Sequence, residues 1–304
     1  TSFDIFGGGT ELNVAIGASR LGLRTAYVTR LTANALGFMV RNKIREQGVD
    51  PSHIVWTEND RVGLYFTESG TNPRGGDLIY DRADSAASKI APGEVDWDNL
   101  FRTARHYHVT GITAALSKNA AEVTKESMAA AKAAGLSVSF DVNYRAKLWS
   151  EAAAKACLEP LLAYVDILFT SASEVKNVFG IAGRDAAETA AAIEAAYGIP
   201  VVGLMQSTRH SVQRITWKAI AYERGKVHED IPIEIEIADR IGGGDAFAAG
   251  FLYAYLTKGS VAEALRYGNA TAALKYTNPG DFSWSTLAEV EGLIRGKGGL
   301  AMKR

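Results

Sequence analysis

The sequence has little of what marks secreted, membrane-spanning or nucleic-acid-binding proteins. Its one cysteine, Cys157, excludes a disulfide within the chain and fits a reducing compartment. The longest apolar run, near residues 246–256, is too short to cross a bilayer, and the opening residues show no charged-then-apolar leader. A net charge of -1 provides no overall positive field for nucleic acid or an anionic membrane. We therefore expect a cytoplasmic globular protein with neither of these partners.

What the sequence does have is an alternation of short β-branched or aromatic runs with alanine-rich helical patterns. The runs that indicate strands begin at Thr25, His106, Val138, Asp166 and Pro200. The helical patterns cover residues 119–134, 151–164 and 185–197. Asn119 and Asp185 each precede a glutamate by three residues, which is the spacing of a capping box. This alternation predicts βαβ units and an α/β fold with a mostly parallel central sheet.

Two segments depart from this alternation. Residues 62–82 are expected to form two strands around a Gly/Pro-rich turn, a hairpin suited to cover a site on an α/β body. Residues 245–256, 260–277 and 285–294 are expected to form three successive helices. Since no internal repeat or low-complexity linker occurs, we expect one domain over residues 1–304, with lid strands from about residues 1–8 and 62–82.

The residues that point to chemistry are three consecutive glycines, Gly242, Gly243 and Gly244, that lead into an apolar helix. Bare backbone at a helix N-terminus exposes N–H groups and a partial positive charge, which together bind an anion such as phosphate. Asp245, in the first turn, would stand beside that phosphate and could accept a proton from an attacking hydroxyl. A plain glycine turn followed by a dipole-favoured aspartate would explain the same residues. Neither the P-loop nor the dinucleotide-binding pattern is present.

Residues 239–245 resemble the signature of the ribokinase-like carbohydrate kinases of the phosphofructokinase-B type, an Asp, two residues, then Gly-Ala/Gly-Gly-Asp before a helix. The resemblance implies a three-layer α/β sandwich with a small β lid, and transfer of a phosphoryl group from ATP, with Mg²⁺, to a sugar. It implies that Asp245 is the base and that the amides of Gly242, Gly243 and Gly244 form the anion hole. By the same analogy, lids pair across a dimer, so we expect a homo-oligomer.

A second block, residues 8–15, is similar to the family's Gly-Gly-x-x-x-Asn-x-Ala segment, which lies against the sugar. Gly8 and Gly9 permit the close approach of a polyol, and Asn13 supplies both a donor and an acceptor. Glycines before an ordinary helix start remain an alternative. The two blocks occur in the family's order, and the resemblance covers nearly the whole chain. In the family an opening strand carries an acidic sugar-binding residue, and from the residues before Gly7 we expect this strand to be missing here.

Within the family, the chain resembles the 2-keto-3-deoxygluconate kinases at residues 63–66, 80–82, 141–145 and 239–245. The resemblance implies substrate contacts from Tyr65, Tyr80, Arg82 and Arg145, with Asp281 in a Gly-Asp loop that reaches the site. An acid sugar carries a carboxylate, which the planar fork of arginine binds in bidentate fashion. Arg145 follows an apolar strand, at the edge where parallel sheets bind ligands. Cross-strand packing of the tyrosines, a solvated Arg82 and a turn role for Asp281 are the alternatives.

For the nucleotide, the family has Asn-x-x-Glu after a strand, and the Glu holds Mg²⁺ through bound water. This chain has Ser171 and Glu174 at these positions, which keeps the carboxylate and replaces the amide. A first-turn carboxylate favoured by the helix dipole is the alternative for Glu174. We further expect the adenine to be bordered by Gln206, Ser207, Gly268 and Asn269.

The leading hypothesis is ATP-dependent phosphorylation of the terminal hydroxyl of 2-keto-3-deoxygluconate, in the breakdown of sugar acids. A kinase of a neutral sugar such as fructose or ribose would keep the same reaction. The third hypothesis is a sugar-binding protein that kept the fold but lost catalysis. The intact Asp245 and its three glycines argue against this last hypothesis.

Overall fold

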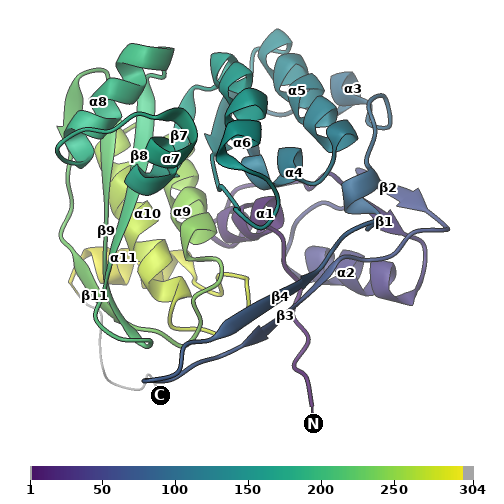
Figure 1. Ribbon diagram of the computed structural model, residues 1–304, viewed down its shortest axis with the longest axis horizontal. Coiled ribbons are helices and arrows are strands. Elements are labelled where there is room, and N and C mark those ends of the chain that lie inside the picture. The colour runs from purple at the N-terminus through teal and green to yellow at the C-terminus, as the bar shows by residue number, and fades with distance from the viewer. Residues whose placement is uncertain (1, 297–304) are drawn as a thin grey trace.

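The computed structural model describes residues 2–296, which form a helix–sheet–helix sandwich (Figure 1). Four parallel strands make up the core of the sheet: β5 (His106–Thr110), β6 (Ser137–Asp141), β7 (Ile167–Ser171) and β8 (Val201–Arg209). On the other side of β8, β9 (Arg214–Glu223) runs antiparallel and pairs with both β10 (Lys226–His228) and β11 (Ile233–Glu236). The expected α/β class and its parallel βαβ body are confirmed.

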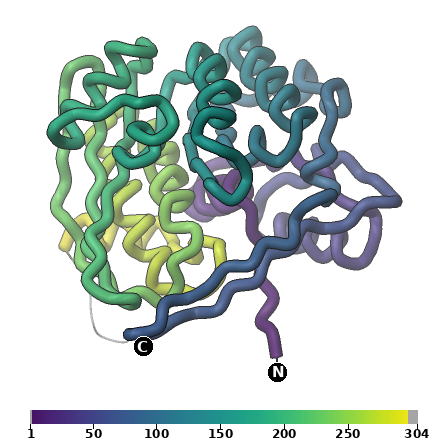
Figure 2. The backbone as a smooth tube through the Cα atoms, in the orientation of Figure 1, coloured from purple at the N-terminus to yellow at the C-terminus, as the bar shows by residue number. Residues whose placement is uncertain are grey.

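Helices cover both faces of this sheet, because residues on the inner strands alternate between two apolar clusters. Leu168 and Val202 face one cluster, whereas Ile167, Phe169 and Val201 face the other. The first face is covered by α3 (Trp97–Phe101), α4 (Gly111–Ala115), α5 (Lys118–Ala133), α6 (Glu151–Leu158), α7 (Ala172–Phe179) and α8 (Ala186–Tyr197). The second is covered by α1 (Thr10–Arg20), α9 (Gly243–Lys258), α10 (Val261–Lys275) and α11 (Leu287–Ile294) (Figures 1 and 2).

The second face fixes the position of α9, whose N-terminus carries the glycine turn. Phe247 and Phe251 of α9 are fully buried and pack edge-to-face on Phe169 of β7, with ring centroids 5.9 and 5.3 Å apart. Gly17 lets α1 lie against α9, since a Cβ there would be 2.7 Å from the Cβ of Ala249. The glycine turn of α9 and the N-terminal end of α1 are therefore held together by the core.

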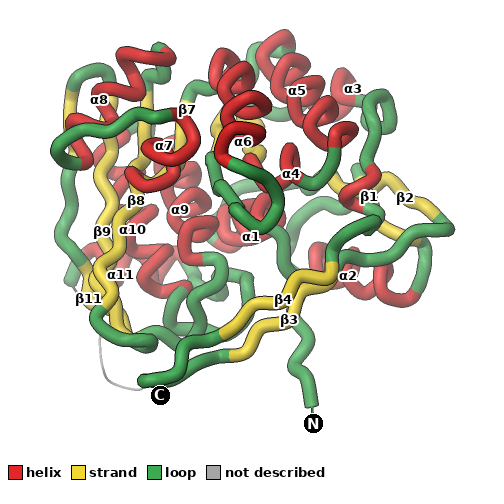
Figure 3. The backbone as a smooth tube through the Cα atoms, in the orientation of Figure 1, coloured by secondary structure: helices red, strands yellow, loops and turns green. Residues whose placement is uncertain are grey.

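The lid is the antiparallel hairpin β3 (Leu64–Glu68) and β4 (Asp77–Asp81), which crosses the lower part of the molecule in Figure 3. Tyr65 and Tyr80 are directly paired across it. The hairpin touches the body at its tip and along its length: the Val212 N–H donates to Asn72 Oδ1 (3.1 Å), and Lys147 Nζ donates to the Leu78 carbonyl (3.1 Å). These contacts hold the lid across the body.

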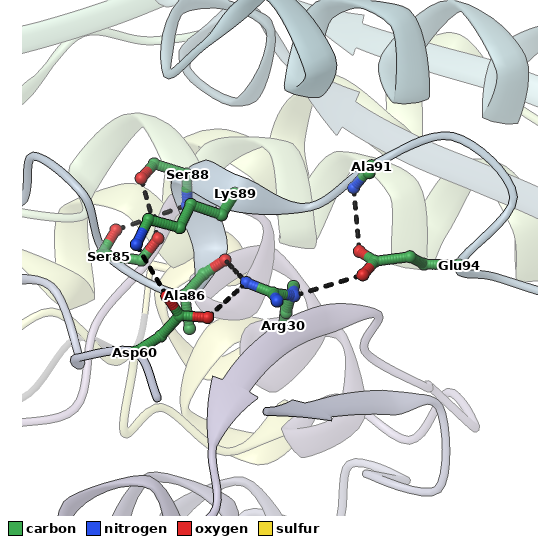
Figure 4. Close-up of polar contacts among 8 residues, drawn as sticks. All are labelled: Arg30, Asp60, Ser85, Ala86, Ser88, Lys89, Ala91 and Glu94. Atoms are coloured by element: carbon green, nitrogen blue, oxygen red, sulfur yellow. Dashed lines mark hydrogen bonds and ion pairs between the residues drawn. The ribbon is translucent and has the colours of Figure 1, made fainter. Parts of the chain in front are cut away.

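A polar cluster fixes the base of the lid (Figure 4). Asp60, just before β3, pairs with Arg30 of β1 (Thr29–Thr32) at 2.6 Å and with Lys89 at 2.8 Å. Arg30 also reaches Glu94, with Nε and Oε1 3.4 Å apart. Because Lys89 follows β4, the cluster ties both ends of the hairpin to one strand of the body.

Three local expectations differ from the structure. Residues 2–8 form no strand, and the ring of Phe3 lies 5.8 Å from that of Phe66, so the lid sheet has only the strands β3 and β4. The strand expected from Thr25 lies instead at Thr29–Thr32 and pairs with β2 (Ile54–Thr57) in a separate sheet, packed with α2 (Ala35–Glu46). Helix α5 is capped by Ser117 rather than Asn119, because the Ser117 hydroxyl accepts from the Ala120 N–H.

Candidate active site

The glycine turn places a carboxylate at the buried start of α9. Gly242 is the N-cap residue, with φ of 79°, a conformation that favours glycine. The first backbone bond of the helix runs from Ala246 N to Gly242 O (2.9 Å), which leaves the amides before it without an intrahelical acceptor. Asp245 lies in this first turn and is only 6% exposed. The turn therefore presents unbonded N–H groups beside a buried acid.

Gly243 and Gly244 differ in how much room the structure leaves for a side chain. A Cβ at Gly243 would lie 2.5 Å from the hydroxyl of Tyr276, whose ring is supported by Trp217 at a centroid distance of 5.7 Å. A Cβ at Gly244 would meet Met205 at ordinary contact distance, with Sδ at 3.6 Å and Cε at 4.0 Å. Residue 243 is the variable small position of the signature. In this chain it must be glycine unless Tyr276 moves, because a larger residue would overlap the ring of Tyr276.

The two sequence blocks meet at Asn13. Its Nδ2 donates to Asp245 Oδ2 at 2.7 Å and to Asp281 Oδ2 at 3.2 Å, while its Oδ1 is buried without a partner. Tyr65 of the lid donates its hydroxyl to Asp281 Oδ1. A Cβ at Gly8 would lie 2.5 Å from Asp281 Oδ2, so the bare backbone of Gly8 borders the same group. The structure thus brings together these five residues.

Gly9 and Glu11 set the position of α1 next to this group. Gly9 has φ of 143° and is the N-cap of α1. Glu11 accepts from the Thr110 N–H (3.1 Å), the Thr110 hydroxyl (2.8 Å) and the Thr113 hydroxyl (2.6 Å), and so joins α1 to the end of β5. The sequence reasoning did not single out Glu11, because its partners lie about a hundred positions away in the chain.

Burial and crowding of acids set the charge state of this group. Burial raises the pKa of Asp245 to about 7; the Asn13 hydrogen bond and Arg145 oppose this rise, while Asp281 and Glu11 add to it. Burial also raises the pKa of Asp281, against the hydrogen bonds from Tyr65 and Asn13. A carboxyl with a pKa near neutrality is suited to exchange protons with a hydroxyl.

Two arginines stand near each other on the lid side of the site. Arg82 stacks on Tyr80, with Cζ 3.9 Å from the ring centroid, and its Nε and Nη2 are buried without a partner. Arg145 donates from Nη1 to the Tyr144 carbonyl (3.1 Å). Burial lowers the pKa of Arg82, and Arg145 contributes to this shift. Neither arginine has an ion-pair partner within residues 2–296, so the pair forms a positive site with free donors.

Glu174 and Asp141 lie at the ends of neighbouring strands. Glu174 and Ser171 form a capping box, and Glu174 Oε1 also accepts from the Tyr144 N–H (3.0 Å). Asp141, at the end of β6, is 4% exposed, and burial together with Glu174 and Asp245 raises its pKa well above the usual range. The sequence analysis did not single out Asp141, although its position at the end of a predicted parallel strand indicates a ligand-binding residue.

These carboxylates fit a magnesium ion held mainly by water and phosphate. Mg²⁺ keeps several waters and uses one or two protein carboxylates, and a cation would relieve the repulsion between Asp141 and Glu174. Because both oxygens of Glu174 already accept hydrogen bonds, a contact through water suits it best. No group of three or more metal-binding side chains occurs among the described residues.

The residues expected at the adenine differ in exposure and lie on different elements, two on β8 and two on α10. Gln206 and Ser207 pair with Lys218 and Trp217 in the β8–β9 ladder, and Ser207 is exposed. Asn269 is fully buried, accepts from Trp217 Nε1 (3.0 Å) and donates to Asp230 (3.1 Å). At Gly268 a Cβ would lie 2.8 Å from the ring of Phe247. Gly268 and the Asn269 side chain are thus closely packed in the interior, and their part in bordering the adenine stays a prediction.

The residues Gly8, Gly9, Tyr65, Arg82 and Asp281 border one cleft of about 1510 Å³. An α/β sandwich with a β lid, a glycine turn at a helix start and a buried acid beside it defines the ribokinase-like class of sugar kinases. The chain belongs to this class as a pfkB family carbohydrate kinase, whose family model matches residues 1–286. It is an ATP-dependent sugar kinase.

Several relatives are named as kinases of keto-deoxy sugar acids. The chain is 38% identical over 288 residues to a 2-dehydro-3-deoxygalactonokinase of Haloferax volcanii, covering 95% of this chain and 87% of the relative. It is 28% identical to a 2-dehydro-3-deoxygluconokinase of Bacillus subtilis, covering 90% and 81%. The crystal structure of the 2-dehydro-3-deoxygluconokinase of Thermotoga maritima matches with a TM-score of 0.94 and 33% identity, covering 97% and 91%. As for membranes, none of the helices in residues 2–296 has both the length and the apolar character to span one.

The two glycines of the turn give a matched test of the packing. Gly243→Ala should lower the free energy of unfolding by about 1–3 kcal/mol, because its Cβ forces Tyr276 to move. Gly244→Ala should cost less than half as much, since its Cβ meets Met205 at ordinary contact distance. Urea unfolding of both variants measures the difference. Equal losses would contradict the assigned role of Tyr276.

Proposed function

We propose that the protein transfers the γ-phosphoryl group of ATP to the terminal hydroxyl of a 2-keto-3-deoxy sugar acid, with 2-keto-3-deoxygluconate as the leading substrate. The observation that carries the substrate class is the pair Arg82 and Arg145, two neighbouring guanidinium groups without an ion-pair partner in the described chain. A sugar carboxylate would supply the missing acceptors. The relatives named for gluconate and galactonate substrates support an acid rather than a neutral sugar. The need for ATP fits the cytoplasmic location expected from the sequence.

In this mechanism Asp245 acts as the general base. Its Oδ2 is held by Asn13, and the substrate hydroxyl would approach the carboxylate from the cleft. The hydroxyl would give its proton to Asp245 as the new O–P bond forms and the bond between the γ-phosphorus and the bridging oxygen breaks, so that ADP leaves. The unbonded amides of Gly242, Gly243 and Gly244 would stabilise the charge that develops on the transferred group. The reaction therefore needs the proton acceptor and the anion-binding amides on the same turn of α9.

The other residues of the site orient the two substrates. The free Oδ1 of Asn13, the bare backbone at Gly8 and Gly9, and the Tyr65–Asp281 pair would bind the hydroxyls of the sugar. Tyr80 would hold Arg82 in place by stacking. On the nucleotide side, Glu174 would bind Mg²⁺ through water, with Ser171, Gln206 and Ser207 along the ATP. When bound, Mg²⁺ neutralises part of the phosphate charge.

The role of Asp245 as the base predicts a loss of kcat when it is replaced and a defined pH dependence in the parent. Asp245→Asn keeps the size of the side chain and should lower kcat by about 10²–10⁴-fold, because the proton acceptor is lost. In the parent, kcat/KM should rise as the pH increases through about 7, where Asp245 becomes deprotonated. A coupled assay of ADP release measures both quantities, and calorimetry of ATP binding shows whether the variant site stays intact. An Asp245→Asn enzyme with the parental rate would rule out the base role.

The acid-sugar assignment depends on the arginines. Arg82→Ala or Arg145→Ala should raise KM for 2-keto-3-deoxygluconate by about 10–100-fold, the effect of one charge-assisted hydrogen bond pair. In Arg82→Ala the rates with fructose or ribose should change little. In Arg145→Ala they should also fall near neutral pH, because Arg145 opposes the rise in the pKa of Asp245. Arg74→Ala removes a lid arginine that is 73% exposed and should leave all KM values unchanged. Equal losses for acid and neutral sugars in Arg82→Ala would favour a neutral substrate, and a parent inactive with every sugar would favour the binding protein.

We also propose a homo-oligomer that pairs through the outer face of the lid. Leu64, Phe66 and Ile79 share this face and are 41%, 42% and 61% exposed, and the 74% exposed Phe3 lies beside Phe66. Such an apolar sheet face is unusual on a monomer. Pairing of two copies would bury these residues and stabilise a lid that has only two strands.

A single charge should break this pairing. Ile79→Asp should shift the protein to monomers in light scattering after size-exclusion chromatography, because two aspartates would face each other across the twofold contact. Ile231→Asp is the control, since Ile231 is 79% exposed but lies outside the lid. A monomeric parent, or an Ile79→Asp variant with the parental mass, would overturn this pairing.

A further inference from the structure

The described chain contains a lysine that is entirely enclosed. Lys275, the last residue of α10, has no exposed surface, and its Nζ donates to the Asn278 carbonyl at 3.1 Å. Lysine is almost never fully buried unless it is paired, because removing an ammonium group from water is costly. No carboxylate of the described residues lies within ion-pair distance of Nζ. One carbonyl contact does not explain why a cation occupies this position.

The side chain of Lys275 packs against the glycine turn at Gly242. A Cβ at Gly242 would lie 3.3 Å from Lys275 Cε and would also collide with the Asp281 carbonyl oxygen. The ammonium group thus lies where the turn at Gly242 meets the turn at residues 278–281. The first turn carries the anion-binding amides, and the second carries Asp281.

The same two turns are joined by further hydrogen bonds. Asp239 accepts from the Gly280 N–H at 2.9 Å and from the Ile241 N–H at 3.1 Å, and the Ala238 N–H donates to the Tyr276 carbonyl at 2.8 Å. These bonds make the turns one unit, and Lys275 lies inside it. A shift of the lysine would therefore be transmitted to both the amides and Asp281.

Three carboxylates of these turns and of α9 each raise the pKa of Lys275. Asp239 comes from the glycine turn, Asp245 from the first turn of α9 and Asp281 from the turn after α10, and each favours the charged ammonium. Burial lowers the pKa of Lys275, and these three acids oppose that shift. In return, the ammonium favours the ionised form of Asp281. Asp245 and Lys275 attract each other in the same way, in addition to the attraction between Asp245 and Arg145, so the enclosed cation offsets part of the repulsion among the acids.

We propose that Lys275 is a positioning residue of the phosphoryl-transfer centre, a fixed internal cation that holds the two turns together and keeps Asp245 available as a proton acceptor. This inference rests on the proposed role of Asp245 and adds a charge that no substrate or metal has to supply. Its position behind Gly242 also places positive charge next to the amides that would bind the γ-phosphate. Lys275 touches neither substrate in this arrangement and acts through its neighbours.

Two neutral variants separate charge from structure. Lys275→Gln keeps a donor for the Asn278 carbonyl, whereas Lys275→Met keeps only the length of the chain. If the charge is what matters, both variants should lower kcat at least tenfold with small changes in the sugar KM. Lys132→Met removes a lysine that pairs with Asp166 away from the site and should leave kcat unchanged. The sugar used is whichever one the parent phosphorylates, so a wrong substrate assignment does not affect this test.

The decisive readout is the titration of Asp245 itself, which needs no turnover. Carboxyl ¹³C NMR of the full chain, with the Asp245 signal assigned from Asp245→Asn, should place its midpoint near pH 7 in the parent. In Lys275→Gln the midpoint should move to higher pH, as expected for the loss of an opposite charge, while Arg145 and Glu11 still act on Asp245 as in the parent. An unchanged midpoint with an unchanged kcat, even if the variant is less stable, would show that Lys275 is only structural. If Lys275→Met does not fold, Lys275→Gln alone decides between the two outcomes.

Discussion

The contact between Asn13 and Asp245 is the constraint around which the site is organised. It joins residues 232 positions apart in the sequence and brings the start of α1 against the start of α9. The contact requires both helices to begin at the same edge of the sheet, and the core enforces this through the close packing of Gly17 on Ala249 and of Phe247 and Phe251 on Phe169. The amide donor of Asn13 offsets part of the cost of burying this acid.

From this contact the polar groups extend outward in two directions. Toward the lid, Asn13 reaches Asp281, which accepts from Tyr65. Arg82 and Arg145 are near each other, and Arg145 also acts on Asp245. Toward the second turn, the carboxylates of Asp239, Asp245 and Asp281 surround the enclosed Lys275. The site therefore combines two arginines with free donors, suited to an anionic substrate, with an acidic centre suited to proton transfer, and Arg145 acts on the acids as well.

The lid is held in place by contacts that are spread over its length. The Asp60 cluster fixes its base, Lys147 and Tyr65 hold its middle, and Asn72 meets the β8–β9 turn at its tip. A two-stranded sheet is marginal by itself, so such tethers are needed to keep Tyr65 and Arg82 over the cleft. The exposed apolar face of the same hairpin is the part of the lid that the body leaves uncovered.

The sequence by itself determined the local features: the glycine turn with Asp245 behind it, the lid hairpin and the alternation of strands and helices. These follow from backbone freedom, capping and apolar periodicity, which act over a few residues. Only the tertiary structure decided that Asp141 crowds Glu174 and Asp245, that Gly268 and Asn269 face the interior, and that Lys275 is enclosed. It also decided that residues 2–8 form no lid strand, and that β1 pairs with β2 apart from the main sheet. Burial, repulsion between acids and strand pairing depend on which distant segments come into contact. Patterns over a few neighbouring residues do not predict these contacts.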